Sequence, residues 1–206
     1  MSQFFHLHPK NPQIRLINQS IDLLKKGSVM VYPTDSGYAL GCLLEKKSAQ
    51  ERICQIRERT SDHHFTLVCR DLSEIALYAY LDNSAFRLIK NNTPGRYTFI
   101  LKATKEVPRR LMNEKRKTIG LRVHSNDIAL ALLDALNEPL MSTTLILPGD
   151  DFAQFDPEQI KQKLGKKVDL IIDGGCIAEQ PTTIIDLTDG NPVLVRAGGG
   201  DTSPFL

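Results

Sequence analysis

The sequence predicts one α/β domain built on a mixed parallel and antiparallel sheet with flanking helices. Helix-like and strand-like segments alternate over most of the 206 residues, and a helix between two strands normally makes those strands parallel. The last two strand-like segments, 182–187 and 192–196, are joined instead by Thr188-Asp189-Gly190-Asn191, which favours an antiparallel hairpin. No linker or internal repeat divides the chain, so we expect a single domain.

The individual elements follow from apolar spacing and from residues that begin or end helices. A first helix is predicted over 14–24, because apolar residues recur there at helical spacing before Lys25-Lys26-Gly27. Ser48 and Glu51 have the spacing of a capping box that starts a second helix, and Ser125 is expected to cap a later one that ends at Leu136. The other helices are predicted at 73–80, 84–91 and 156–165, and the strands before the final hairpin at 28–33, 64–69, 97–101, 118–123, 139–147 and 168–173.

The composition is that of an ordinary globular protein, with 24% charged residues and a net charge of +2. No apolar run approaches the roughly 20 residues that a membrane span needs. The N-terminus also lacks the basic and apolar regions of a signal peptide. The four cysteines have neither paired nor metal-binding spacing, which predicts reduced thiols in a cytoplasmic protein.

The residues after the first predicted strand are the strongest candidate for a binding site. The run Pro33-Thr34-Asp35-Ser36-Gly37-Tyr38-Ala39-Leu40-Gly41-Cys42 follows a β-rich apolar segment, and we expect it to form a loop. Ligands of open α/β sheets bind where strands end, because neighbouring loops part there. The hydroxyls and the carboxylate of this run therefore predict a small-molecule site.

Hydroxyl and arginine side chains are also expected near other strand ends. An arginine inside an apolar strand, such as Arg122 or Arg196, needs a partner. Its fork of donors suits a carboxylate or a phosphate, and that partner can be a ligand or an aspartate of a structural ion pair. Side chains two residues apart share a face of a strand, which groups Thr118 with Gly120 and Arg122, and Ser142 with Thr144.

Several common active sites are absent from the sequence. There is no P-loop and no nucleophile elbow, and Gly198-Gly199-Gly200 is not followed by the helix that a dinucleotide site needs. His6, His8 and the pair His63-His64 lack a set of further ligands, so we predict surface or packing roles for them and no metal site.

The segment from Lys102 to Arg122 carries eight basic residues against only Glu106 and Glu114. Such a local excess attracts phosphates, either of a nucleotide or of RNA. A solvated loop is the alternative interpretation. The candidate RNA contacts are Arg109, Arg110, Lys115, Arg116 and Lys117.

A series of motifs, in the same order along the chain, resembles the YrdC-like family, and within it the YciO branch. The resemblance covers about residues 14–200 and leaves 201–206, which we expect to be a flexible tail. The best-known members make threonylcarbamoyl-AMP from threonine, bicarbonate and ATP for tRNA modification, and members are described as binding double-stranded RNA. The motifs are Pro33–Gly41, Arg57-Glu58-Arg59, Pro94–Thr98, Thr118–Arg122, Pro139–Thr144, Pro181–Asp186 and Leu194–Gly198.

The resemblance implies an open, twisted sheet whose concave face is basic and holds two groups of ligands. The amino-acid substrate would be bound by Thr34, Arg122, Ser142 and Thr182. The nucleotide would be bound by Arg57, Arg59, His63, Thr118, Thr144 and Arg196. It further implies ATP as a substrate with Mg²⁺ on its phosphates and no tightly bound cofactor. Attack on the α-phosphate would depend on positioning and charge neutralisation, so no side chain is assigned as a catalytic residue.

The chain departs from the pattern of the synthases at two places. Arg57 stands where they carry lysine, and Ile146 stands where they carry the asparagine of Ser-Ala-Asn. Ile146 cannot form a hydrogen bond, and the loss of a polar contact to a charged ligand costs on the order of 1.5–3 kcal/mol. We therefore expect a synthase-like nucleotidyltransferase with weakened or altered activity. The alternatives are a non-catalytic RNA-binding protein and a sensor of a nucleotide or metabolite.

Overall fold

The structure, a computed structural model, describes residues 2–58, 65–178 and 180–206. Within these residues the strands are β1 (Gln3–His6), β2 (Met30–Thr34), β3 (Gly37–Leu43), β4 (Thr66–Val68), β5 (Tyr97–Lys102), β6 (Thr118–Arg122), β7 (Leu140–Thr144), β8 (Leu170–Asp173), β9 (Thr183–Asp186) and β10 (Val193–Arg196). They form one sheet in the order β1-β8-β2-β3-β7-β4-β6-β5-β9-β10. Parallel and antiparallel pairs both occur, and β9 and β10 form the expected antiparallel hairpin. The predicted single domain with a mixed sheet is confirmed.

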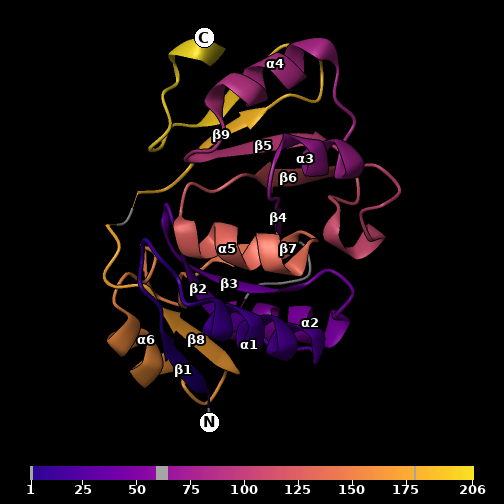
Figure 1. Cartoon of the computed structure of the whole chain (residues 1–206). Coiled ribbons are helices and arrows are strands. Elements are labelled where there is room, and N and C mark those ends of the chain that lie inside the picture. The colour runs from indigo at the N-terminus through magenta and orange to yellow at the C-terminus, as the bar shows by residue number, and fades with distance from the viewer. Residues whose placement is uncertain (1, 59–64, 179) are drawn as a thin grey trace.

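Helices cover the two faces of the sheet unequally. The α-helices are α1 (Ile14–Lys25), α2 (Lys47–Arg57), α3 (Leu72–Tyr78), α4 (Asn83–Asn92), α5 (Asp127–Leu136) and α6 (Pro157–Leu164). The larger core cluster joins one face of the sheet to α2, α3, α4 and α6. On the opposite face, α1 and α5 pack against each other and against β2, β3, β7 and β8. In Figure 1, β5, β6 and β9 lie above α5 and α1, next to α3 and α4.

The face that carries α1 and α5 is polar where these helices do not cover it. Thr66 of β4 is paired with Ser142 of β7 and with Gly120 of β6, so these three residues share one face. Thr98 of β5 and Ile184 of β9 continue that face toward the β10 edge. A row of hydroxyl side chains is therefore left open to a ligand.

The predicted loop after the first strand is in fact mostly a strand. Gly37–Leu43 forms β3, which is antiparallel to β2 and completely buried. A strand buried on both faces lacks the alternation of polar and apolar residues that marks an exposed strand, and Gly41 resembles a loop residue. Gly41 is required because a Cβ there would lie 2.9 Å from Cε1 of the Tyr32 ring. Only the turn at Asp35 and Ser36 remains of the predicted loop.

Two predicted helix caps differ from the structure. Helix α2 begins at Lys47, so Ser48 lies inside it and forms no cap. Helix α5 is capped by Asn126, whose side chain accepts from the N–H groups of Ile128 and Ala129. Ser125, the predicted cap, instead donates its N–H to Asp35. A hydrogen bond to a residue far away in the sequence has taken precedence over the local cap.

Both ends of the chain are packed on the sheet. Strand β1 pairs with β8, so the fold extends to the N-terminal side of residue 14. At the other end, Phe205 is 4% exposed and its ring lies against the rings of Tyr97 and Phe99. Phe205, which belongs to the segment predicted to be a flexible tail, is therefore packed against β5. No helix of the described residues is long and apolar enough to cross a membrane.

Candidate ligand-binding site

Two adjoining cavities lie on the open part of the sheet. The first, here called the arginine cavity, has a volume of about 220 Å³ and is lined by Arg57, Thr66, Val68, Thr98, Arg122, Ser142, Thr143, Thr144, Ile146, Thr182, Ile184 and Arg196. The second, here called the apolar cavity, has a volume of about 280 Å³ and is lined by Phe65, Thr66, Thr98, Ile100, Leu111, Asn113, Arg116, Thr118, Ile119, Gly120, Ile184 and Val195. Both are lined by Thr66, Thr98 and Ile184, so they adjoin one another, and together they are here called the hollow.

Arg122 is a buried cation of the arginine cavity. It ends β6 and is 7% exposed. Its Nη2 donates to Asp35 Oδ1 at 2.7 Å and to Ser36 Oγ at 3.0 Å. Its Nε has no hydrogen-bond partner among the described residues. Asp35 therefore balances the charge of Arg122 without occupying all of its donors.

Asp35 stays ionised in this environment. Burial by itself raises the pKa of a carboxyl group. The hydrogen bond from His124, the charge of Arg122 and the N–H of Ser125 outweigh burial and hold the pKa of Asp35 well below its usual range. A permanently charged carboxylate can hold the guanidinium group of Arg122 in one position.

The hydroxyl of Thr34 maintains the turn rather than lining the cavity. It donates to the carbonyl of Gly37 at 2.6 Å and accepts from the N–H of Ser36 at 3.1 Å. Thr34 is 2% exposed, and its hydroxyl oxygen lies 3.2 Å from Ser36 Oγ, which accepts from Arg122. Ser142 does line the cavity, and its Oγ lies 2.8 Å from the hydroxyl of Tyr32.

Thr182 and Arg196 meet on the opposite wall of the arginine cavity. The hydroxyls of Thr182 and Thr98 are 3.0 Å apart. Arg196 donates from Nε and Nη2 to the carbonyl of Thr182, at 3.2 and 2.9 Å. Arg196 lies on the edge strand β10 and is exposed. Its guanidinium group therefore both donates to Thr182 and faces solvent.

The third wall is formed by the end of α2 and the residues after β7. Arg57 is buried and contacts the hydroxyl of Thr143 and, at 3.4 Å, the carbonyl of Ile146. Thr144 and Ile146 both line the cavity, so the apolar side chain stands in the wall of the site. The predicted nucleotide contacts Arg59 and His63 lie outside the described residues.

Thr118 lies in the apolar cavity, apart from the other predicted nucleotide contacts. Arg116 forms part of the same wall, and its Nη2 donates to Asp186 Oδ2 at 2.7 Å and to Thr188 Oγ1 at 2.8 Å. Burial opposes ionisation of Asp186, but the hydrogen bonds from Thr188 and Arg116 lower its pKa. The apolar cavity is thus bordered by a neutralised ion pair and otherwise lined by apolar and uncharged polar residues.

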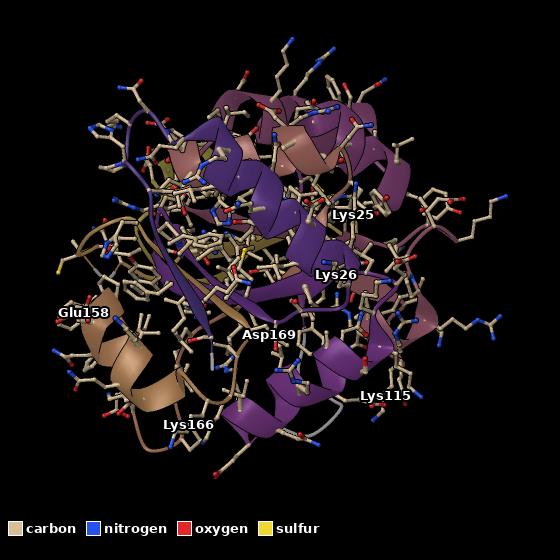
Figure 2. All side chains as sticks on the ribbon, turned by 60° about the horizontal axis from the view of Figure 1, so that its bottom comes forward. Lys25, Lys26, Lys115, Glu158, Lys166 and Asp169 are labelled. Atoms are coloured by element: carbon tan, nitrogen blue, oxygen red, sulfur yellow. The ribbon has the colours of Figure 1, made fainter. Side chains whose placement is uncertain are left out.

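The predicted RNA contacts divide into two groups. Arg110 donates to the Gln50 side chain at 2.8 Å and to the carbonyl of Leu44, and Arg116 is bound to Asp186. Both arginines thus have partners within the fold, although their side chains are also exposed. Arg109, Lys115 and Lys117 are exposed. In Figure 2, Lys115 lies at the periphery of the molecule beside α2.

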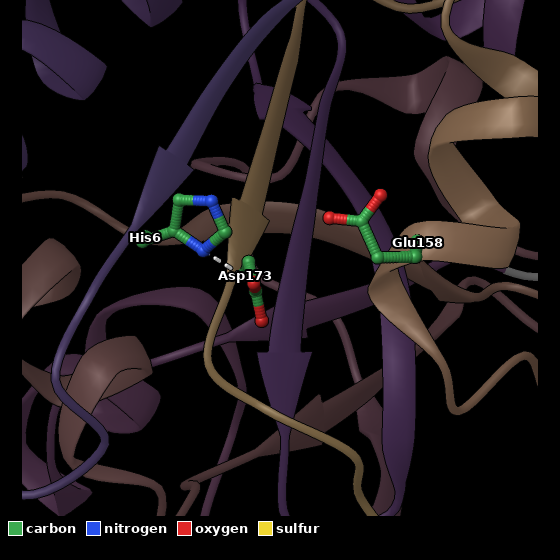
Figure 3. Close-up of side chains that lie close together, drawn as sticks. All are labelled: His6, Glu158 and Asp173. Carbon is green, nitrogen blue, oxygen red and sulfur yellow. Dashed lines mark ion pairs between the residues drawn. The ribbon is translucent and has the colours of Figure 1, made fainter.

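One group outside the hollow brings together possible metal ligands. His6, Glu158 and Asp173 have ligand atoms within 4.8 Å of one another (Figure 3). His6 Nδ1 is 2.6 Å from Asp173, and Lys161 lies 3.8 Å from Glu158. Each carboxylate thus already has a basic neighbour, and the ammonium of Lys161 opposes a further cation. A surface ion pair fits the role predicted for His6.

Some residues of the site escaped the sequence analysis. Thr66 and Thr98, which join the two cavities, lie on strands where no particular residue was selected. Their signal was weak, because threonine is common in strands of every function. His124 lies two residues after Arg122, and Asp35 lies inside the motif selected from the sequence. No local pattern indicates that Asp35 contacts both Arg122 and His124.

The fold and the two cavities define a class of protein: an open mixed-sheet domain whose cavities present guanidinium and hydroxyl groups, the groups that suit an anionic ligand. A family model described as Sua5_yciO_yrdC, telomere recombination, matches residues 22–198. The uncharacterized protein YciO of Escherichia coli K12 is 66% identical over 206 residues, which is all of both chains. Its crystal structure superimposes with a TM-score of 0.96 over both whole chains. The chain therefore belongs to the Sua5/YciO/YrdC family.

Two more distant solved structures share the fold. Sua5 of P. abyssi complexed with L-threonine is 24% identical, with a TM-score of 0.88, 96% of this chain covered and 58% of that one. HypF in a phosphate- and nucleotide-bound form is 17% identical, with a TM-score of 0.76, 88% of this chain covered and 29% of that one. At these identities the likeness establishes the fold alone.

Proposed function

We propose that this protein is a nucleotide-dependent nucleotidyltransferase, similar to threonylcarbamoyl-AMP synthases and linked to tRNA modification in the cytoplasm, with an altered nucleotide site. The observation that carries the proposal is the junction of the arginine cavity and the apolar cavity at Thr66 and Thr98. A cavity with three guanidinium groups suits carboxylate and phosphate groups, and a neighbouring apolar cavity suits a base. The L-threonine complex of Sua5 and the nucleotide-bound HypF support the same two ligand classes.

The residues suggest a division of labour. Arg122 would bind the carboxylate of an amino acid such as threonine, with Ser142 and Thr182 orienting its other polar groups. Arg57 and Arg196 would neutralise the phosphates of ATP, which carries its own Mg²⁺. In the reaction, a carbamate oxygen of the N-carboxylated amino acid forms a bond to the α-phosphorus, and the bond to pyrophosphate breaks. Fixing two anions in line accelerates such a step without a protein nucleophile.

Ile146 is the residue that should limit this activity. It lines the arginine cavity where the synthases carry asparagine. Restoring a hydrogen bond to a charged ligand is worth on the order of 1.5–3 kcal/mol, or roughly 10- to 100-fold. We therefore expect Ile146→Asn to bind ATP more tightly and to release pyrophosphate faster by about that factor. Ile14→Asn, a change at an exposed position of α1, is the matched control.

The test measures ATP binding by calorimetry and pyrophosphate release with ATP, Mg²⁺, bicarbonate and each amino acid in turn. Activity of the wild type with one amino acid, increased in Ile146→Asn but not in Ile14→Asn, supports the proposal. If neither the wild type nor Ile146→Asn binds nucleotide or releases pyrophosphate, the enzyme proposal is wrong.

A second candidate function is binding of structured RNA without turnover. It is favoured by Arg109, Lys115 and Lys117, which are exposed on one segment. Replacing these three by glutamate should weaken RNA binding and reduce its salt dependence, by roughly one unit of slope for each phosphate that is no longer bound. The control is a triple variant with the same change in charge elsewhere on the surface (Figure 2). It replaces Lys25, Lys26 and Lys166 by glutamate. Equal binding by both triple variants, measured by fluorescence anisotropy, would exclude this segment as the RNA site.

A further inference from the structure

A buried histidine outside the lining of the arginine cavity contacts the same carboxylate oxygen as Arg122. His124 has no exposed surface. Its Nδ1 is 3.0 Å from Oδ1 of Asp35, the same oxygen that accepts from Arg122 at 2.7 Å. The other oxygen of Asp35 accepts from the N–H of Ser125 at 3.1 Å. Asp35 is thus held from two elements, β6 and the start of α5, and in turn holds Arg122.

The geometry fixes the tautomer of His124. A carboxylate can only accept, so the proton of the neutral ring is on Nδ1 and the hydrogen bond runs toward Asp35. Nε2 then carries a lone pair, and it has no partner among the described residues. The charged or titratable groups that face the ring are Asp35, Arg122 and, at a ring-centroid distance of 6.4 Å, Tyr32.

The charge of His124 depends on whether an anion occupies the cavity. Burial and the positive charge of Arg122 lower the pKa of His124, and Asp35 only partly opposes them. In the empty site one anion, Asp35, already balances one cation, Arg122, so a second cation is unfavourable. An anionic ligand on Arg122 adds the negative charge that a protonated His124 needs.

We propose that His124 is a positioning residue: it orients Asp35 and Arg122 for an anionic ligand and takes up a proton from solvent when that ligand binds. The inference rests on the proposed function only in that an anion binds at Arg122. Affinity for that anion then rises as the pH falls from 8 toward 6. Linkage requires this sign, because the bound state holds more protons than the free state.

The first measurement needs no ligand. Long-range ¹H–¹⁵N spectra of the whole protein report the tautomer of His124 and its titration. We expect the Nδ1-protonated form, with a titration midpoint below that of an exposed histidine. A proton on Nε2 at neutral pH overturns the proposal, whatever the protein's activity. The failure of the proposed function is thereby distinguished from the failure of this inference.

The second measurement is calorimetry with L-threonine as the probe, because its carboxylate and ammonium groups keep their charges between pH 6 and pH 8. Repeating each titration in buffers of different ionisation enthalpy gives the number of protons taken up. We expect uptake at pH 6 and tighter binding there than at pH 8.

Two variants separate positioning from packing. His124→Asn keeps a donor near the Nδ1 position but cannot titrate, so it should bind the probe within about threefold of the wild type and take up no proton. His124→Leu keeps the volume but removes the donor and should weaken binding by about tenfold or more. Wild-type proton uptake in His124→Asn, or wild-type affinity in His124→Leu with a native circular dichroism spectrum, would refute the role of His124.

Discussion

Replacement of Asp35 by asparagine tests the organisation of the site most directly. The side chains of Arg122 and Asp35 are 9% and 6% exposed, so the variant leaves a buried guanidinium group without its counter-charge. Breaking a buried ion pair in this way costs about 3–5 kcal/mol of unfolding free energy. For a domain of this size that corresponds to a decrease in Tm of roughly 6–20 °C.

Asp169→Asn is the matched control. Arg52 and Asp169 also form an ion pair at 2.7 Å, but their side chains are 38% and 37% exposed. A pair that remains in contact with water contributes at most about 1 kcal/mol. Urea and thermal unfolding followed by circular dichroism should therefore separate the two variants by several kcal/mol. If Asp35→Asn lowers the free energy of unfolding no more than Asp169→Asn does, burial does not govern the strength of these ion pairs and the reasoning fails.

The effect of Asp35 should also depend on pH in one direction. Its pKa is lower in the folded protein than in the unfolded chain, so the folded state binds the proton more weakly. The contribution of Asp35 to stability is therefore complete above about pH 4, the usual pKa of an aspartate, and is lost as the pH falls further. The difference between wild type and Asp35→Asn should be constant from pH 8 to pH 5 and shrink below pH 4. A difference that grows on acidification contradicts this.

Three further changes test the fold and the wall of the cavity. Phe205 is 4% exposed, so Phe205→Ala should lower the free energy of unfolding by about 3–5 kcal/mol. Leu206 is 88% exposed, and its removal should leave the free energy of unfolding, measured with urea, almost unchanged. Gly41→Ala should destabilise by about 1–3 kcal/mol through the 2.9 Å approach to Tyr32. A second change, Tyr32→Leu, should recover part of that loss in a double-mutant cycle. Arg196→Ala should weaken ATP binding in calorimetry about tenfold, and Arg196→Lys should not restore it, because lysine lacks the fork that holds Thr182.

Local patterns in the sequence accounted for much of the fold. Helices and strands were placed close to their observed positions wherever one face was apolar, as in α1. The largest failure was β3, which is buried on both faces and contains glycines, so it shows neither period. The strand β1 was not predicted, since four residues at an edge carry too short a pattern.

The site was predictable in composition but not in arrangement. Alternation along a strand was enough to place Thr118 and Arg122 on one face, yet they line different cavities. The sequence also could not distinguish arginines that face a ligand from those that serve the fold. Arg110 and Arg116, for example, have partners, Gln50 and Asp186, that approach them only in the folded chain.

The amino-acid sequence alone determined a mixed α/β domain, the family resemblance and the hydroxyl and guanidinium groups available for an anionic ligand. These properties follow from periodicity and residue chemistry, which are local. Only the tertiary structure decided that Asp35 meets Arg122 and His124 across 87 and 89 positions of the chain. It also decided that α1 and α5 leave part of one face uncovered. Pairing over such separations depends on strand order, and no short-range pattern encodes strand order.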